Sequence, residues 1–233
     1  MDKKYKSKDN TRSEREKLRD MIFGEKIAYI WDYYRYYIIG GVFAIILITS
    51  VIYQYSTRPN VGLFVAWSAG FLEHEEVESL SAALEEHIFE ANSNETADIS
   101  FFFTNDDDPS YSIQYYNRLM AMLTAGTIDI FIVDMSTLLF YSSSEFIWPL
   151  DIVLNDIKAS SPELYEVISK ETVSTMFGSD DGDKTLEITA IRITDSPLMN
   201  KLGFVMENDA FFCMAISTQR IDRVAPALKM FFE

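Results

Sequence analysis

The chain is poor in the residues from which covalent cross-links and most metal centres are built. Its 233 residues include one cysteine, Cys213, which excludes an intramolecular disulfide and any cluster or zinc finger that needs several cysteines. Two histidines, His74 and His87, leave little material for a histidine-based metal site. No G-x-S-x-G, P-loop or G-x-G-x-x-G motif occurs, so acyl transfer and nucleotide chemistry lack support. We therefore expect no enzyme, with no catalytic residue, metal or cofactor.

Positive charge is also scarce over most of the chain, whose net charge is −16. Residues 58–233 carry ten Lys and Arg against 29 Asp and Glu, whereas residues 1–35 carry ten against seven. An acidic chain is a poor ligand for a phosphate backbone. We therefore expect no nucleic acid among its partners.

No charged residue occurs between Arg35 and Arg58, and this window predicts a membrane-spanning helix over residues 36–57. Its 22 residues extend about 33 Å as a helix, against a hydrocarbon core of about 30 Å. Aromatic residues typical of the membrane interface flank both of its ends: Trp31, Tyr34, Tyr36, Tyr37, Tyr53 and Tyr55. No small-residue cleavage pattern follows the span, so we expect an uncleaved signal-anchor in a cell membrane. The basic excess before it predicts a cytoplasmic N-terminus and an extracellular C-terminal domain.

Residues 1–35 form the predicted cytoplasmic leader, and two interpretations of its second half remain open. Thr11-x-x-Glu14 is a capping-box pattern, followed by apolar residues at a loose helical spacing. The segment is either an amphipathic helix on the inner leaflet or a continuation of the membrane helix. Within the span, Gly40 and Ala44 have the small-xxx-small spacing that permits close helix packing, although this spacing also arises by chance.

Residues 58–233 are predicted to form one α/β domain. Apolar runs predict strands over 60–67, 98–104 and 128–134, and helical spacing predicts helices over 71–89, 111–125 and 136–142. Later segments predict a hairpin over 172–193 with an acidic turn, a buried strand over 210–217 and a closing helix over 220–232. Such continuous apolar runs are typical of strands covered on both faces, so we expect a mostly parallel sheet.

Ligands of open α/β sheets collect beyond the carboxyl ends of the parallel strands. The residues at those ends are the candidate ligand-binding residues Trp67, Ser68, Asn105, Asp106, Asp134, Ser136 and Asp195. The alternative is that these polar side chains cap the helices that follow, a common role of Ser, Asp and Asn. Tyr115, Tyr116 and Trp148 are either exposed anchors for a partner protein or core residues.

Other patterns that suggest chemistry have a simpler interpretation. His74 and Glu78 share a helical spacing but lack the second histidine of H-E-x-x-H, so a solvated pair is favoured over a zinc site. The aspartates in 106–108 and 180–183 lack calcium-loop spacing and predict solvated loops. Cys213 lies in an apolar run and predicts an inert core thiol.

The sequence LMAMLTAGTIDIFIVD at 119–134, with Leu138 and the WPLD at 148–151, resembles one lobe of the extracellular solute-binding proteins of ABC transporters. Residues 211–232 are similar to the segment with which such chains return to that lobe. Only about 35 residues separate Asp151 from Thr185, where those proteins insert a second lobe, so the resemblance implies a truncated, one-lobed domain. Residues 26–41 resemble the leaders of small membrane-anchored proteins of monoderm bacteria.

Three functions are therefore weighed. The first is an extracytoplasmic protein-interaction domain, an accessory subunit of a membrane complex such as a transporter. Its expected partners are the lipid bilayer and either a membrane protein or a second copy of the chain. The alternative is a one-lobed small-molecule receptor derived from a solute-binding protein. A cation-dependent enzyme that uses the acidic loops is the third.

Overall fold

The computed structural model describes residues 22–56, 59–91, 93–102, 109–177, 185–204, 206 and 208–233. The chain forms two compact units, Met1–Arg58 and Pro59–Glu233. Of the predicted features, the capping box at residue 11 and the acidic loops at 106–108 and 180–183 lie outside the described residues. The two units are described separately below.

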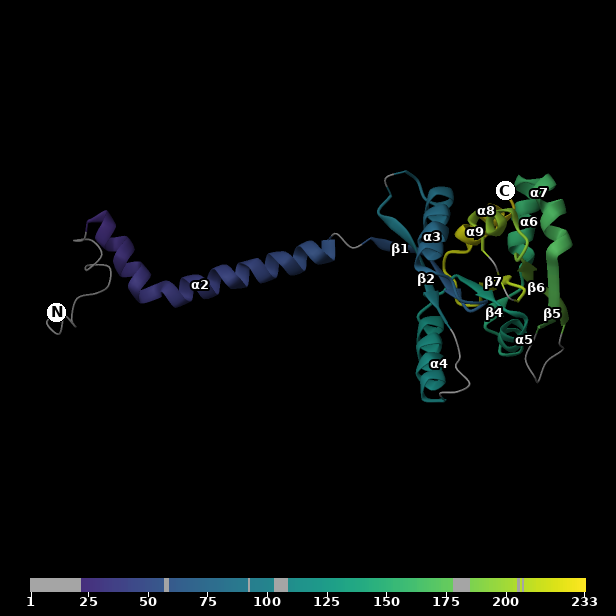
Figure 1. Ribbon diagram of the computed structural model, residues 1–233, viewed down its shortest axis with the longest axis horizontal. Helices are drawn as coiled ribbons and strands as arrows, with labels where there is room; N and C mark the ends of the chain where they lie inside the picture. The colour runs from purple at the N-terminus through teal and green to yellow at the C-terminus, as the bar shows by residue number, and fades with distance from the viewer. Residues whose placement is uncertain are drawn as a thin grey trace. The chain divides into compact units, whose positions relative to one another are not determined.

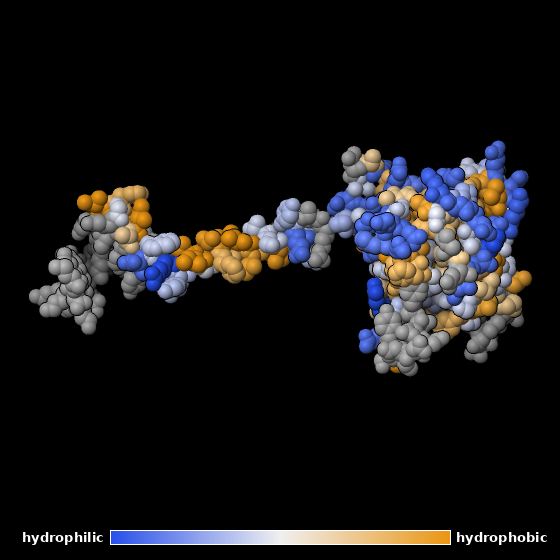
Figure 2. Space-filling view, viewed as in Figure 1, coloured by the Kyte–Doolittle hydropathy of each residue, from blue (hydrophilic) through white to orange (hydrophobic). Residues whose placement is uncertain are grey.

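The first unit contains α2 (Phe23–Ser56), a continuous helix of 34 residues. Its segment Tyr34–Ser56, 23 residues, is long and apolar enough to cross a membrane. At about 1.5 Å per residue this segment extends about 34 Å, which matches the predicted span. Figure 2 shows a continuous hydrophobic surface along the middle of the helix, and Figure 1 shows its first turns bending away from the rest. The residues before the span are thus helical as well.

The second unit is built on a seven-stranded sheet in the order β2-β1-β3-β7-β6-β5, with β4 paired to β7. The strands are β1 (Asn60–Trp67), β2 (Glu95–Phe101), β3 (Ile130–Val133), β4 (Ile147–Trp148), β5 (Thr172–Phe177), β6 (Thr185–Arg192) and β7 (Phe211–Ala215). The predicted strands 60–67 and 172–177 have the observed bounds, and the other predicted strands overlap the observed ones.

The sheet is mixed, so the prediction of a mostly parallel sheet is wrong. Only β1 pairs in parallel, with β2 and β3; the pairs β3–β7, β4–β7, β5–β6 and β6–β7 are antiparallel. All five residues of β7 are buried, as are all four of β3. A strand that is covered on both faces is apolar throughout, whether it runs parallel or antiparallel to its neighbours. Its sequence therefore indicates burial but not strand direction.

Helices cover both faces of the sheet (Figure 1). One face carries α3 (His74–Ile88), α6 (Asp151–Ser160), α7 (Pro162–Ile168), α8 (Pro197–Leu202) and α9 (Ile221–Phe232), and the other carries α4 (Pro109–Thr124) and α5 (Met135–Ser143). Two hydrophobic clusters fill the layers: Leu80, Leu154 and Phe231 belong to the first, and Leu119 and Leu138 to the second. Helices α6, α7 and α8 and strand β4 were not predicted.

Local sequence explains where the elements begin and end. The Glu73 side chain and the Glu76 side chain form a capping box at the start of α3. Gly126, with φ of +64°, follows α4 in the left-handed conformation that glycine adopts without strain. Pro162 occupies the first turn of α7, where its missing N–H is not needed. These local signals set the start of α3, the end of α4 and the start of α7.

Candidate functional site

The carboxyl ends of β1 and β3 form a crevice at the point where the chain connections diverge. β1 continues into α3 on one face of the sheet, whereas β3 continues into α5 on the other. The two strands are held together here by the Ser68 amide, which donates to the Ile132 carbonyl at 2.7 Å. In open α/β sheets such a divergence leaves space between the two connections, and ligands bind there.

A cavity of about 380 Å³ lies in this crevice, between α4 and α5. Its lining combines five aromatic rings with a few polar side chains: Ser68, Phe102, Tyr115, Tyr116, Leu119, Asp134, Ser136, Thr137, Phe140 and Tyr141. The volume is within the usual range for ligand pockets, about 300–1,000 Å³. The cavity is therefore the candidate site.

The structure brings three of the predicted residues, Ser68, Asp134 and Ser136, together in this lining. Trp67 is fully buried, and its indole Nε1 donates to the Gly70 carbonyl at 2.8 Å, so it belongs to the core. Asp195 lies in a separate depression and pairs with Arg192 at 3.2 Å. Asn105 and Asp106 lie outside the described residues.

Asp134 provides the negative charge in the crevice, and it also caps α5. Its Oδ1 accepts from the Thr137 amide at 2.8 Å and from the Ser136 hydroxyl at 3.0 Å. Its Oδ2 accepts a weaker share of that hydroxyl's bond at 3.1 Å. The capping alternative for Asp134 is thus confirmed. Because a carboxylate oxygen accepts two hydrogen bonds, Oδ2 keeps capacity for a ligand.

Two hydroxyl groups show the character of the crevice. Ser68 Oγ is buried and has no hydrogen-bond partner among the described residues. A buried hydroxyl without a partner is unfavourable unless a ligand or water satisfies it. Tyr141 lies on the buried side of α5, and burial, followed by the negative charge of Asp134, raises the pKa of its phenol far above the ordinary value. The Tyr141 phenol therefore lies in a weakly polar environment and interacts with the negative charge of Asp134.

The outer face of α5 extends the crevice as an apolar surface. Met135, Leu139 and Phe140 are 44%, 55% and 50% exposed, although Leu138 and Tyr141 on the inner face already supply the core contacts. Tyr116 on α4, 44% exposed, continues this surface across the cavity. A helix that is apolar on both sides normally has a partner on both sides. Within the described residues, about half of each of these side chains stays exposed, although the Phe140 ring also contacts Phe146 edge-on.

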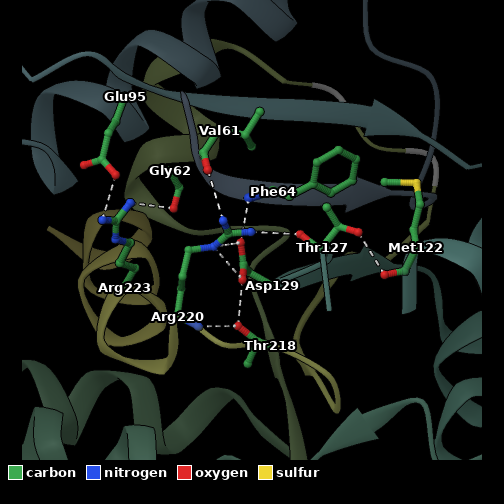
Figure 3. A network of polar contacts seen from close by, with 10 residues as sticks. All are labelled: Val61, Gly62, Phe64, Glu95, Met122, Thr127, Asp129, Thr218, Arg220 and Arg223. Atoms are coloured by element: carbon green, nitrogen blue, oxygen red, sulfur yellow. Dashed lines mark hydrogen bonds and ion pairs between the residues drawn. The ribbon is translucent and has the colours of Figure 1, made fainter. Parts of the chain in front are cut away.

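The opposite end of β1 carries a polar network that is fully satisfied (Figure 3). Asp129, with no exposed surface, accepts from the Phe64 amide at 2.8 Å and from the Thr218 hydroxyl at 2.7 Å. Arg220 Nε lies 3.0 Å from Asp129 Oδ2, and its terminal nitrogens donate to the carbonyls of Val61 and Thr127, each at 3.0 Å. This network fastens the start of α9 to β1 and β3.

Arg223 extends the network by one turn of α9. Its Nη1 donates to the Gly62 carbonyl at 2.7 Å, and its Nη2 pairs with Glu95 at 2.9 Å. The guanidinium also lies 5.3 Å from the centre of the Phe89 ring. Sequence analysis assigned no role to Asp129, Arg220 or Arg223. A signal existed in Asp129 itself, a charged residue inside an apolar strand run, which is tolerated only when it is paired.

The remaining predicted chemistry is structural or solvated. His74 and Glu78 form a highly exposed pair at 3.1 Å, as predicted. Cys213 is fully buried, and burial raises the pKa of its thiol, which opposes thiolate formation. Within the described residues, no group of three His, Cys, Asp or Glu side chains is arranged to hold a metal ion. Trp148, 43% exposed, packs against Phe177.

No protein-family model matches this chain, and no curated protein is significantly similar to it.

Proposed function

We propose that this chain is a non-enzymatic, single-pass membrane-anchored domain that binds a partner protein at the α4–α5 crevice. In this proposal it serves as an accessory subunit of a membrane complex such as a transporter. The observation that carries the proposal is the apolar outer face of α5 beside a preformed cavity. Exposed aromatic and aliphatic side chains around a pocket are typical of the central residues of protein interfaces.

The proposed location follows from the apolar helix and the charge distribution. Tyr34–Ser56 is long enough to span the bilayer, and it separates a basic leader from a domain with a large acidic excess. Under the positive-inside rule the leader is cytoplasmic and residues 58–233 are extracellular. The chain enters the domain just before the amino end of β1, whereas the crevice lies at the carboxyl end of β1.

A photo-crosslinking experiment in native membranes tests the proposal. A benzoylphenylalanine side chain in place of Phe140 should give a discrete adduct with a specific protein, identified by mass spectrometry. The matched control is the same side chain in place of Val167, which is 45% exposed on α7, on the opposite face of the sheet from α5. Equal adducts from both positions, or none from Phe140, would contradict the proposal.

Protease protection tests the orientation. Protease added to intact protoplasts should remove the domain while an N-terminal tag survives. Digestion of the tag with protection of the domain would show the inverse orientation. Recovery of the full chain in the soluble fraction would show that α2 is not a membrane anchor.

The second candidate function, a one-lobed receptor for a small molecule, is favoured by the cavity itself and by the buried Ser68 hydroxyl. The resemblance to a solute-binding lobe is the sequence observation behind it and stays a prediction. A thermal-shift screen of amino acids, peptides and sugars with the full chain in detergent addresses this function. Saturable stabilisation by one compound, lost in Ser68→Val, would favour the receptor, and uniformly unchanged unfolding temperatures would remove it.

A further inference from the structure

The crevice has a chemical preference that its apolar character alone does not specify. Four of its aromatic rings, those of Tyr115, Tyr116, Phe140 and Tyr141, lie in the same lining as the Asp134 carboxylate. Aromatic faces attract cations through their negative quadrupole, and the attraction increases where water is excluded. A carboxylate beside such rings adds a directed hydrogen-bond acceptor.

Asp134 is placed to act on a ligand while it keeps its structural role. Both of its present bonds are local: the Thr137 amide and the Ser136 hydroxyl bind chiefly Oδ1, at 2.8 and 3.0 Å. Oδ2 receives no other hydrogen bond from the described residues than the share of Ser136 at 3.1 Å. The positive end of α5 stabilises this carboxylate, but it brings no formal positive charge to the crevice.

Arg118, a basic residue of α4 next to this lining, has its own aromatic partner. The Arg118 guanidinium lies 5.1 Å from the centre of the Phe102 ring. Arg118 is not part of the cavity lining. The Phe102 ring thus already has a cation, Arg118, beside it. The Asp134 carboxylate in the cavity lining has no such cationic neighbour in that lining.

We propose that the crevice binds the cationic head of a basic residue, Arg or Lys, carried by the partner protein, with Asp134 as the hydrogen-bond acceptor and the surrounding rings as the walls. This inference rests on the proposed protein-binding function and specifies its central contact. Charge complementarity supports it, because residues 58–233 carry 29 acidic against ten basic side chains and would attract a basic partner surface. Met135, Leu139 and Phe140 would then contact the apolar neighbours of that basic residue.

The test uses the full chain in detergent micelles at a salt concentration that screens the general acidity of the domain. Nα-acetylarginine methylamide and its uncharged isostere Nα-acetylcitrulline methylamide are titrated separately, and binding is followed by calorimetry. We expect saturable binding of the arginine compound and at least about tenfold weaker binding of the citrulline compound. Equal affinities, or no saturation by either compound up to about 50 mM, would overturn the inference.

Three variants separate the site from the overall charge. Asp134→Asn keeps an N-cap side chain, so α5 should stay folded while the arginine compound binds at least about fivefold more weakly. Arg118→Gln removes the neighbouring cation and should strengthen binding by about twofold. Glu163→Gln on α7 removes one negative charge outside the cavity and should change nothing. An arginine preference that is unchanged in Asp134→Asn would overturn the assignment of that residue.

The outcomes distinguish this inference from the function on which it rests. If the Phe140 adduct forms and persists in Asp134→Asn at wild-type yield, the protein-binding function stands and the basic contact is wrong. If no adduct forms but the arginine compound binds through Asp134, the protein-binding function is wrong and the crevice is a cation-selective small-molecule site.

Discussion

The two ends of strand β1 differ in how completely their polar and apolar groups are satisfied. At the amino end, the carbonyls of Val61 and Gly62 and the amide of Phe64 all have side-chain partners from Asp129, Arg220 or Arg223. At the carboxyl end, the Ser68 hydroxyl is buried without a partner among the described residues, and an open cavity follows. The strand is thus closed at one end and open at the other.

This difference separates stability from binding within one element. A fully bonded ion pair with a buried carboxylate leaves no capacity for a ligand, so the amino end is structural although it contains a prominent charged cluster. At the carboxyl end, the cavity and the exposed apolar side chains of α4 and α5 leave a surface that a partner can bind. A charged cluster is therefore a poor guide to function in this domain. Polar groups without hydrogen-bond partners and exposed apolar side chains are better guides.

The largest expected effect comes from breaking the closed end. Arg220→Met leaves the buried Asp129 carboxylate without its cation, and loss of one partner of such a pair costs about 3–5 kcal/mol of unfolding free energy. Denaturant unfolding of the full chain in detergent, followed by near-UV circular dichroism, measures it. The double variant Asp129→Leu with Arg220→Met should lose less than the single variant, and a single-variant loss below about 1 kcal/mol would contradict the account.

A smaller loss is expected from Gly62→Ala. A Cβ at this position would lie 2.6 Å from Arg223 Nη1 and 2.7 Å from the Phe89 ring, both of which are held by other contacts. We expect a loss of about 1–3 kcal/mol in the unfolding free energy of the domain. Gly41→Ala in α2, where nothing lies within 4 Å, is the control and should leave domain unfolding unchanged. Equal unfolding midpoints for the two variants would show that β1 is not tightly held at Gly62.

At the open end, the buried phenol of Tyr141 should make the unfolding free energy fall at alkaline pH. Because the folded-state pKa of Tyr141 is raised, its stabilising contribution is complete below the unfolded value of about 10 and is lost progressively above it. The unfolding free energy should fall by up to about 1.4 kcal/mol per pH unit from this group, and Tyr141→Phe should remove that part of the slope. Denaturant titrations at pH 8 to 11 measure the slopes, and identical slopes would place the phenol in water.

The smallest effects give the sharpest contrast between the two ends. Thr218→Ala removes a hydroxyl that donates to Asp129 at 2.7 Å and should cost about 1 kcal/mol. Ser68→Ala removes a buried hydroxyl that has no hydrogen-bond partner among the described residues, so it should leave the unfolding free energy unchanged or raise it by up to about 1 kcal/mol. If Ser68→Ala proves as costly as Thr218→Ala, the carboxyl end is as well bonded as the amino end.

The sequence predicted the elements better than their directions. Strand β1 was located because its apolar run reflects burial, and β5 was located by the acidic turn sequence that follows it. The direction of β7 depends on connections that no local pattern records. The helices α6 to α8 were not predicted because, at ten, seven and six residues, they are too short for a helical period to repeat clearly.

The candidate site was predicted in part, from topology alone. Ser68, Asp134 and Ser136 follow two parallel strands that do lie side by side, so the rule for carboxyl ends brought them together. Asp195 follows an antiparallel strand, which is why it lies elsewhere. The aromatic walls contributed by α4, with Tyr115 and Tyr116, depend on packing between helices and were left undecided.

One measurement tests the central claim, that the carboxyl end of β1 binds a partner protein and the amino end stabilises the fold. Benzoylphenylalanine in place of Tyr116 reports on the crevice in native membranes, and its adduct yield is compared between the otherwise unchanged chain and two charge-introducing variants. Leu139→Asp, at a side chain that is 55% exposed on α5, should abolish the adduct without lowering the unfolding midpoint. Val167→Asp, at a similarly exposed side chain on α7, should leave the adduct at full yield. Full yield in Leu139→Asp, or equal loss in both variants, would contradict the claim.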